Sequence, residues 1–341
     1  MCDDPSSIPI RLGLLLLLSA PGAACTAGPP SAQSCLADEP APAVSAMERA
    51  PELIFQSGFE AGTEIVRHEP SFDRIVGDDT SVPERGDWEA DLQEHPAIGS
   101  FRIFYSDGND SQRRTTLVDD PAAPGDQVME FRLMRANEPH VGPDKGRIQF
   151  GVNNNVDLQG FSYQVRIRLE DGFDELNQVE DRITWMTLAE LWNNGANQAF
   201  PFRITLNLNK ERGAGEPLYW AAHAQIRRSK GDWEDQWKIT APDVPLPIGE
   251  WATLRVDVAE GCGEHGWFRV VLTTEDGLDH TIVDRRDLTQ HPNDPHPDGF
   301  GSFNPLKLYT GQALVDHVRE QGANLVVLWD DFALFDRAGT P

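Results

Sequence analysis

The residues of this chain that could do chemistry gather first in a segment running from Thr184 to Lys210. Within it, the run FRITLNLN alternates strictly between apolar and polar side chains, which predicts a strand with one buried face. The polar side is made of groups that bind hydroxyls and carboxylates well, namely Arg203, Thr205, Asn207 and Asn209. The preceding run, TWMTLAELW, puts Glu190 and Trp192 on a common face.

Two further segments place polar pairs on one face by the same parity. Arg147 and Gln149 are two residues apart in RIQF, and Lys307 and Tyr309 are two apart in LKLYTG. We expect these pairs and the polar side of FRITLNLN to line one sheet face that forms a groove for a sugar chain. The alternative is an ordinary polar sheet face exposed to solvent.

The elements that must position these residues are short strands. About a dozen alternating runs are bounded by Gly, Pro or Asp, and only one segment, 311–321, reads as a helix, with Gly322 placed to cap it. This pattern predicts an all-β fold, an antiparallel sandwich or barrel with one short helix near the C-terminus. The first run, at 53–55, and the last, at 325–335, are expected to pair or to lie adjacent.

Composition excludes one class of partner. The 341 residues carry a formal net charge of −26 at pH 7, and nucleic-acid binding needs clustered Lys and Arg. The acidity favours solubility and says nothing about the fold.

The N-terminus predicts export. Residues 1–25 contain a short apolar run, Leu12–Leu18, followed by small residues and Cys25, as in a bacterial lipoprotein signal. Lipidation of Cys25 would anchor the protein to the outer membrane, whereas an ordinary signal cut near Ala24 would leave it periplasmic or extracellular. Residues 26–52 are rich in Ala, Pro and Ser and predict a disordered linker, and residues 53–336 form the folded domain.

Two other cysteines follow the signal. Cys35 and Cys262 could pair in an oxidising compartment, although Cys35 falls in the predicted linker. No Cys or His spacing suggests zinc.

Several segments in order resemble a known family. FQSGFE, PIGEWATLRVDV, HGWFRVVL, LKLYTG and LWDDFALF resemble the concanavalin A-like jelly-roll domains of bacterial polysaccharide lyases, in the heparin-lyase-like and alginate-lyase-like groups. The resemblance covers about residues 53–336. It implies a jelly-roll β-sandwich that acts on an acidic, uronic acid-containing polysaccharide by β-elimination.

The resemblance also implies roles for the polar residues. Elimination needs a cation or amide on the uronic carboxylate, a base for the adjacent proton and an acid for the leaving oxygen. The implied catalytic residues are Tyr309, Lys307 and Arg147. The implied substrate-binding residues are Gln149, Glu190, Trp192, Arg203, Asn207 and Asn209. This chain lacks the family's Gln-Ile-His motif and reads Ala-Glu-Leu, with Glu190, at the similar position.

Two other functions stay open. Glycoside hydrolysis needs two carboxylates, for which Glu190 is one candidate, but no strand of paired acids is present. A non-catalytic glycan-binding module would stack sugars on aromatic side chains, for which the candidates are Trp192, Tyr219, Trp220 and Trp233.

Acidic residues near both ends of the domain predict a structural Ca²⁺ site. Glu60 follows the first strand, and Asp330 and Asp331 interrupt the last one, where unpaired acids are costly unless solvated or metal-bound. The alternative is a pair of solvated acids. We expect no organic cofactor and a monomeric protein.

Overall fold

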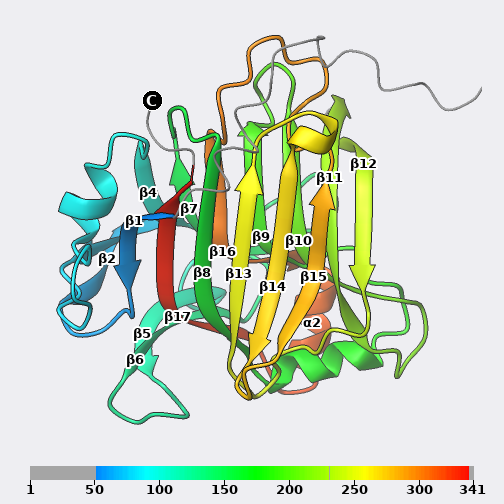
Figure 1. Cartoon of the computed structure of the whole chain (residues 1–341). Helices are drawn as coiled ribbons and strands as arrows, with labels where there is room; N and C mark the ends of the chain where they lie inside the picture. The colour runs from blue at the N-terminus through cyan, green and yellow to red at the C-terminus, as the bar shows by residue number, and fades with distance from the viewer. Residues whose placement is uncertain (1–50, 230, 338–341) are drawn as a thin grey trace, which may run out of the picture. The chain divides into compact units, whose positions relative to one another are not determined.

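The computed structural model describes residues 51–229 and 231–337. Two antiparallel sheets pack face to face in a jelly-roll β-sandwich (Figure 1). The predicted all-β antiparallel fold is therefore confirmed. The predicted signal, linker and lipidated Cys25 lie outside the described residues.

One sheet has eight strands. Its order is β15-β14-β13-β8-β17-β6-β5, and β1 pairs with β17 beside this path. The bounds are β1 Glu52–Ser57, β5 Arg113–Asp119, β6 Gln127–Leu133, β8 Gly160–Leu169, β13 Ala252–Ala259, β14 Trp267–Thr274, β15 Asp279–Arg286 and β17 Leu325–Asp336.

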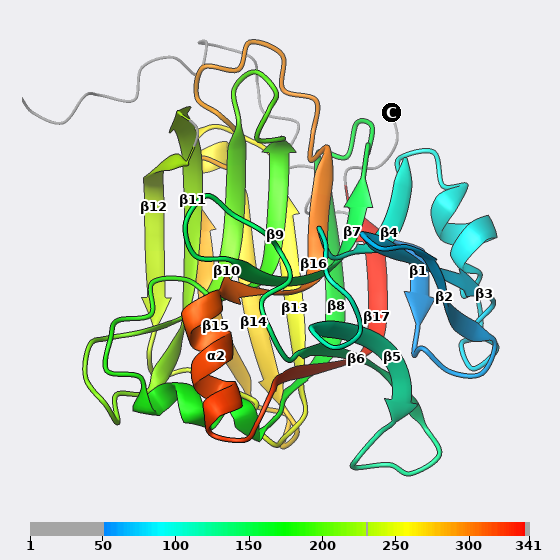
Figure 2. The ribbon, with the colours of Figure 1, turned by 180° about the vertical axis from the view of Figure 1, so that it is seen from behind.

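The other sheet has nine strands in the order β12-β11-β10-β9-β16-β7-β4-β3-β2, and it faces the viewer in Figure 2. The bounds are β2 Thr63–Glu69, β3 Phe72–Gly77, β4 Ser100–Phe104, β7 Lys145–Asn153, β9 Thr187–Asn194, β10 Phe202–Lys210, β11 Leu218–Ser229, β12 Asp232–Ala241 and β16 Ser302–Gly311.

Helical structure in the described part of the chain is short. The predicted C-terminal helix is α2, Gln312–Glu320. Three further short helical segments in the described part of the chain are η1 Trp88–Gln93, η2 Asp171–Gln178 and η3 Gly263–His265. No helix among the described residues is long and apolar enough to cross a membrane.

The core lies between the sheets and follows from the alternation in the sequence. On β10, Ile204, Leu206 and Leu208 are fully buried, and their polar neighbours project from the opposite face of the same sheet. Large aromatic side chains such as Trp88 and Trp329 fill the interior of the sandwich. Because the apolar side of each strand is used for packing, the outer face of the nine-stranded sheet is free to hold polar residues.

The first and last strands pair, as the sequence predicts, in a register that sets Leu53 opposite Phe335. The structure also contains β2, β3 and β5, which the sequence analysis did not identify. β2 and β3 form a hairpin at the edge of the nine-stranded sheet, where most side chains are partly exposed. An edge hairpin needs little apolar alternation, so its strands have a weak signal in the sequence.

Candidate active-site groove

A groove of two lobes lies on the outer face of the nine-stranded sheet. The first lobe, of about 490 Å³, is lined by residues of β7, β9, β10 and β16 and by the end of the β11–β12 hairpin. The second lobe, of about 710 Å³, lies over β10, β11 and β12. The two lobes share six lining residues that mark their junction, namely His140, Lys145, Arg203, Gly231, Trp233 and Tyr309.

The strand register brings the predicted residues of β7 and β16 together. Arg147 lies opposite Tyr309, and Gln149 lies opposite Lys307. Directly opposite residues on one face have neighbouring side chains, so these four form a compact cluster in the first lobe. On the other side of β16, Arg203 of β10 lies opposite Trp192 of β9.

Glu190 of β9 holds two of the cations in place. Its side chain is almost completely buried, and its carboxylate pairs with the Lys307 ammonium and, at 3.1 Å, with the Arg203 guanidinium. Burial raises the pKa of Glu190, but the charges of Lys307 and Arg203 outweigh burial and lower it to about 2. Burial lowers the pKa of Lys307 to about 8, against the opposing effect of Glu190. At neutral pH both groups are charged, and Glu190 positions cations in the groove.

Tyr309 lies among cations at the junction of the lobes. Its ring centre is 4.3 Å from the Arg147 guanidinium carbon, 5.0 Å from Lys307 Nζ and 5.5 Å from Lys145 Nζ. The ring also contacts Trp185, with centroids 5.0 Å apart. A negative charge that develops at this tyrosine or on a bound substrate is therefore surrounded by three positive charges.

Two aromatic side chains form a wall beside Arg203. The ring centroids of Trp192 and Trp233 are 5.5 Å apart, and the Arg203 guanidinium carbon lies 3.9 Å from the centre of the Trp233 ring.

The other two aromatic residues considered for sugar stacking lie elsewhere. Trp220 is fully buried in the core, because it falls on the apolar side of β11. The Tyr219 hydroxyl donates to Glu211 at 2.7 Å, away from both lobes.

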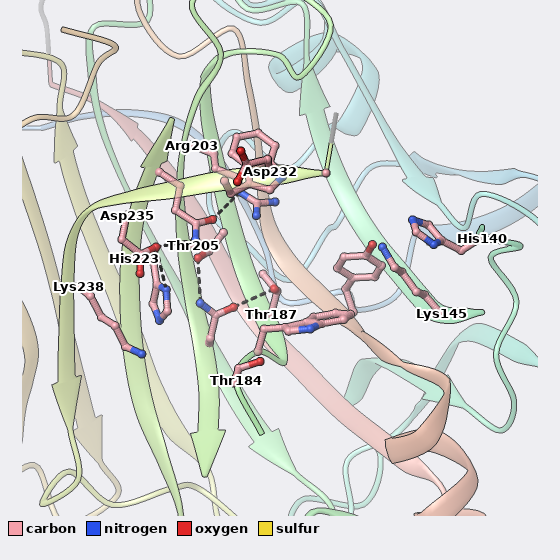
Figure 3. Close-up of a pocket in the computed structure, with 16 residues that line it drawn as sticks. His140, Lys145, Thr184, Thr187, Arg203, Thr205, His223, Asp232, Asp235 and Lys238 are labelled. Atoms are coloured by element: carbon pink, nitrogen blue, oxygen red, sulfur yellow. Dashed lines mark hydrogen bonds and ion pairs between the residues drawn. The ribbon is translucent and has the colours of Figure 1, made fainter. Parts of the chain in front are cut away.

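The floor of the second lobe is uncharged. The Thr187 hydroxyl donates to the Asn207 carbonyl oxygen at 2.8 Å, and the Asn207 amide donates to the Thr205 hydroxyl oxygen at 2.8 Å (Figure 3). His223 lies directly opposite Thr205 on the neighbouring strand β11. Its Nδ1 is 3.6 Å from Asp235 Oδ1, and its Nε2 is buried without a hydrogen-bond partner in the described structure.

Asn209 does not join the groove, although its parity matches that of Asn207. It is 1% exposed, and its amide nitrogen donates to the Thr184 and Leu208 carbonyl oxygens. The segment that leads into β9 pairs with the end of β10, through Ile183 and Lys210, and covers this position. The alternation of residues along β10 therefore predicted the correct sheet face. Which side chains on that face stay accessible depends on the segment before β9, which crosses over the end of the strand.

Several groove residues escaped the sequence analysis. His223 and Gln225 alternate with buried residues along β11, and Asn304 on β16 reaches the first lobe at the position opposite Glu190. The signal that could have found His223 and Gln225 is their period-two spacing in WAAHAQI, which places both on the face opposite Trp220. Asn304 can take this position because residue 151 is glycine. A Cβ on Gly151 would lie only 2.8 Å from the Asn304 amide nitrogen.

The structure brings the acids of the predicted Ca²⁺ site near one another. A Cβ added at Gly58 would lie within 4 Å of Glu60, Asp330 and Asp331, and Glu60 also accepts a backbone hydrogen bond from Gln127. Asp330 pairs with Arg166 at 2.7 Å, but burial and Asp331 still raise its pKa to about 7. Among the described residues, no group of three or more His, Cys, Asp and Glu side chains is arranged to hold a metal ion.

Cys262 is disulfide-bonded in the structure. Its predicted partner, Cys35, lies outside the described residues.

The carboxylates of the groove are poorly suited to glycoside hydrolysis. A hydrolase needs one carboxyl group that is protonated at working pH and can serve as the acid. The carboxyl of Glu190 has the opposite property, with a pKa of about 2, and Glu138 pairs with Arg147 at 3.0 Å. The cations around Tyr309 instead suit a substrate that carries negative charge.

No protein-family model matches the sequence, and no curated protein matches it. The structure is similar to a solved endo-β-1,4-glucuronan lyase from the fungus Trichoderma reesei, at 12% identity and a TM-score of 0.41, over 70% of this chain and 95% of that one. It is also similar to an alginate lyase from Aplysia kurodai, at 9% identity and a TM-score of 0.45, over 83% and 98% of the two chains. A third similar structure is the exoplasmic domain of VIP36 with bound Ca²⁺ and a mannose disaccharide, at 14% identity and a TM-score of 0.37, over 68% and 85%.

Proposed function

We propose that this protein is an exported polysaccharide lyase that cleaves a uronic acid-containing polysaccharide by β-elimination. The observation that carries the proposal is the position of Tyr309, a proton-carrying side chain enclosed by the cations of Arg147, Lys307 and Lys145 at the centre of an open groove. Elimination next to a carboxylate requires this combination of proton carrier and positive charge.

The carboxylate of the substrate would be held in the first lobe. Arg147 and Lys307 supply positive charge there, and the Gln149 side chain, whose amide nitrogen can donate to a carboxylate, lies next to both. When the proton adjacent to the carboxylate leaves, charge accumulates on the carboxylate oxygens. Fixed cations that face these oxygens stabilise the transition state more than the ground state, which is the requirement for catalysis.

The chemical step balances with the groups present. With Tyr309 as the phenolate, its oxygen takes the proton from C5 of the uronate, and the electrons of that C–H bond form a double bond between C5 and C4. The bond from C4 to the bridging oxygen breaks, and that oxygen takes a proton to become the hydroxyl of the departing sugar. Tyr309 serves both transfers, as base and then as acid, so no net proton is consumed.

Absorbance of the unsaturated product in the ultraviolet tests the proposal. We expect the purified protein to generate it from a uronate polymer such as glucuronan, and Tyr309→Phe to lower kcat/KM by about 10²- to 10⁴-fold with unchanged thermal stability. Tyr219→Phe is the matched control, since Tyr219 lies outside both lobes, and it should retain full activity. Full activity of Tyr309→Phe would remove the mechanism.

The competing function is a non-catalytic glycan-binding module. The wall of Trp192 and Trp233 favours it, because aromatic faces beside a groove stack on sugar rings. Binding of uronate polymers, measured by calorimetry, without any ultraviolet product from the wild-type protein would select this alternative.

Export and lipidation at Cys25 are part of the proposal and rest on the N-terminal sequence. The disulfide at Cys262 supports export, since disulfides persist mainly in oxidising compartments. Mass spectrometry of the mature N-terminus distinguishes a lipidated Cys25 from a signal cut near Ala24.

A further inference from the structure

We propose that the second lobe of the groove selects an uncharged sugar through one of its hydroxyl groups, so that the substrate is a mixed polysaccharide in which uronate units adjoin neutral sugars. This inference rests on the proposed function for the identity of the polymer. It concerns a different part of the groove from the predicted chemistry, and its central residue, His223, belongs to neither the catalytic nor the cationic cluster.

The first argument is the distribution of charge along the groove. The floor of the first lobe contains the charged groups Arg147, Glu190 and Lys307. The buried floor of the second lobe contains only neutral groups, namely Thr187, Thr205, Asn207 and His223. The remaining charged lining has both signs: Lys145 and Arg203, which the lobe shares with the first, and Lys238 are cations, and Asp232 and Asp235 are acids. A uronate carboxylate placed over the neutral floor beside His223 would thus lose hydration without gaining a cation from that floor.

The second argument is the polarity of the hydrogen bonds. The Thr205 oxygen already accepts the Asn207 amide, which leaves its hydroxyl hydrogen to point elsewhere. Asp235 lies beside Nδ1 of His223 and, as an acceptor, favours the tautomer with hydrogen on Nδ1. The lone pair of Nε2 is then a buried acceptor without a partner in the described structure, on a residue that lines the lobe and lies directly opposite Thr205 across the strand pair.

This pairing of donor and acceptor suits a hydroxyl group. A sugar hydroxyl both accepts and donates, so it can satisfy Thr205 and His223 together, whereas a carboxylate only accepts and would be repelled by the lone pair of Nε2. His223 is 9% exposed in its side chain, and leaving a buried acceptor unsatisfied is costly. Sites of this kind reject ligands that lack the hydroxyl strongly.

The tautomer argument holds at neutral pH. Burial lowers the pKa of His223 below its ordinary value, and the charged groups that face the ring are Asp235 and Lys238 on β12 and Arg203 on β10. Of these, Asp235 opposes the effect of burial, while Lys238 and Arg203 add to it. The imidazole ring is therefore neutral at neutral pH, which is the state in which Nε2 can accept a hydrogen bond from a sugar hydroxyl.

The sugar in the second lobe is a different unit from the one at Tyr309. Tyr309 is on β16 and His223 on β11, three strand spacings away across the sheet, or about 14 Å. A polysaccharide that crosses the strands would therefore present one unit to the catalytic cluster and another, further along, to His223.

The test compares polymers on the full-length mature protein. The probes are deacylated gellan, in which each 4-linked glucuronate lies between neutral glucose units, and glucuronan and alginate, in which every unit carries a carboxylate. We expect gellan to have the highest kcat/KM in the ultraviolet assay and the tightest binding by calorimetry. Equal or better activity and binding with the two uronate homopolymers would overturn the inference and leave the lyase proposal intact.

Variants of the two recognising groups make the test specific. His223→Phe and Thr205→Val should each raise KM for gellan by roughly ten- to a hundredfold, whereas the constants for glucuronan should change much less. His223→Gln keeps an acceptor oxygen and should recover part of the gellan affinity at an unchanged melting temperature. An equal loss on both polymers in all three variants would mean that the residues are structural and would overturn the inference.

The outcomes separate this inference from the proposed function. If no polymer yields an unsaturated product but gellan binds best and loses affinity in His223→Phe, the lyase proposal fails and the hydroxyl-selective lobe stands. If there is no product and no preference for gellan, both fail.

Discussion

The Lys307 ammonium and the Glu190 carboxylate form a buried ion pair in the floor of the groove, between two strands that are adjacent in the sheet but more than a hundred residues apart in the chain. Arg203 binds the second oxygen of the same carboxylate. One anion therefore orients two of the cations that would face a uronate.

Removing this anion should cost stability. We expect Glu190→Gln to lower the free energy of unfolding by about 3–5 kcal/mol, because it leaves Lys307 as an uncompensated buried charge. Urea denaturation measures the effect, with Glu234→Gln as the control, since the pair of Glu234 with Arg228 is largely exposed and should contribute little to stability. A loss in Glu190→Gln no larger than the control would contradict the buried ion pair.

Arg203 should contribute to binding and rate together. We expect Arg203→Ala to lower kcat/KM on a uronate polymer by roughly ten- to a hundredfold, with KM raised and kcat lowered, because a cation that holds the carboxylate acts in both the ground and the transition state. Arg182→Ala is the control, since Arg182 is exposed and pairs with Glu211 away from both lobes. Unchanged kinetics in Arg203→Ala would exclude this arginine from the site.

The pH dependence of activity should report Lys307. Burial lowers its pKa to about 8, so we expect kcat/KM to fall as pH rises through about 8 and the ammonium loses its proton. In Lys307→Arg the side chain stays charged, and any remaining activity should lack this descending limb. A rate that does not fall through pH 8 would contradict a requirement for the Lys307 ammonium.

The pH dependence of stability should report two buried acids far from Tyr309. Burial raises the pKa of Glu260 to about 7, against hydrogen bonds from Asn193 and the Gly299 amide, and burial together with Asp331 raises that of Asp330 to about 7. At pH values between the ordinary carboxyl pKa and about 7, the folded protein therefore binds more protons than the unfolded chain. Both acids therefore stabilise the fold fully below their ordinary pKa values, and this contribution is lost as pH rises to about 7.

Thermal melts between pH 4.5 and 8 measure this contribution. We expect Glu260→Gln to weaken the dependence of the melting temperature on pH in this window, because the amide cannot ionise. Glu138→Gln is the control, since Glu138 sits in an ion pair with Arg147, and it should leave the slope in place. An identical pH profile in wild type and Glu260→Gln would refute a raised pKa at Glu260.

The sequence by itself determined the class of fold and the face of each strand in the groove. Strict alternation assigns Arg147, Gln149, Lys307 and Tyr309 to the polar sides of their strands, because side chains alternate with a period of two whatever the neighbours are. The pairing of the first and last strands was also predictable, because the chain ends of such sandwiches usually pair or lie adjacent. The edge hairpin of β2 and β3 was not, since its half-exposed residues need no regular pattern.

Only the tertiary structure decided which polar residues meet. The strand order places β16 between β7 and β9 and so brings Lys307 to Glu190. The alternation of residues along one strand does not predict this order. The tertiary structure likewise covers Asn209 with the segment before β9 and places His223 in the lining of the second lobe. The physical reason is that alternation is a local property of the backbone, whereas register, strand order and coverage depend on contacts between segments distant in the chain.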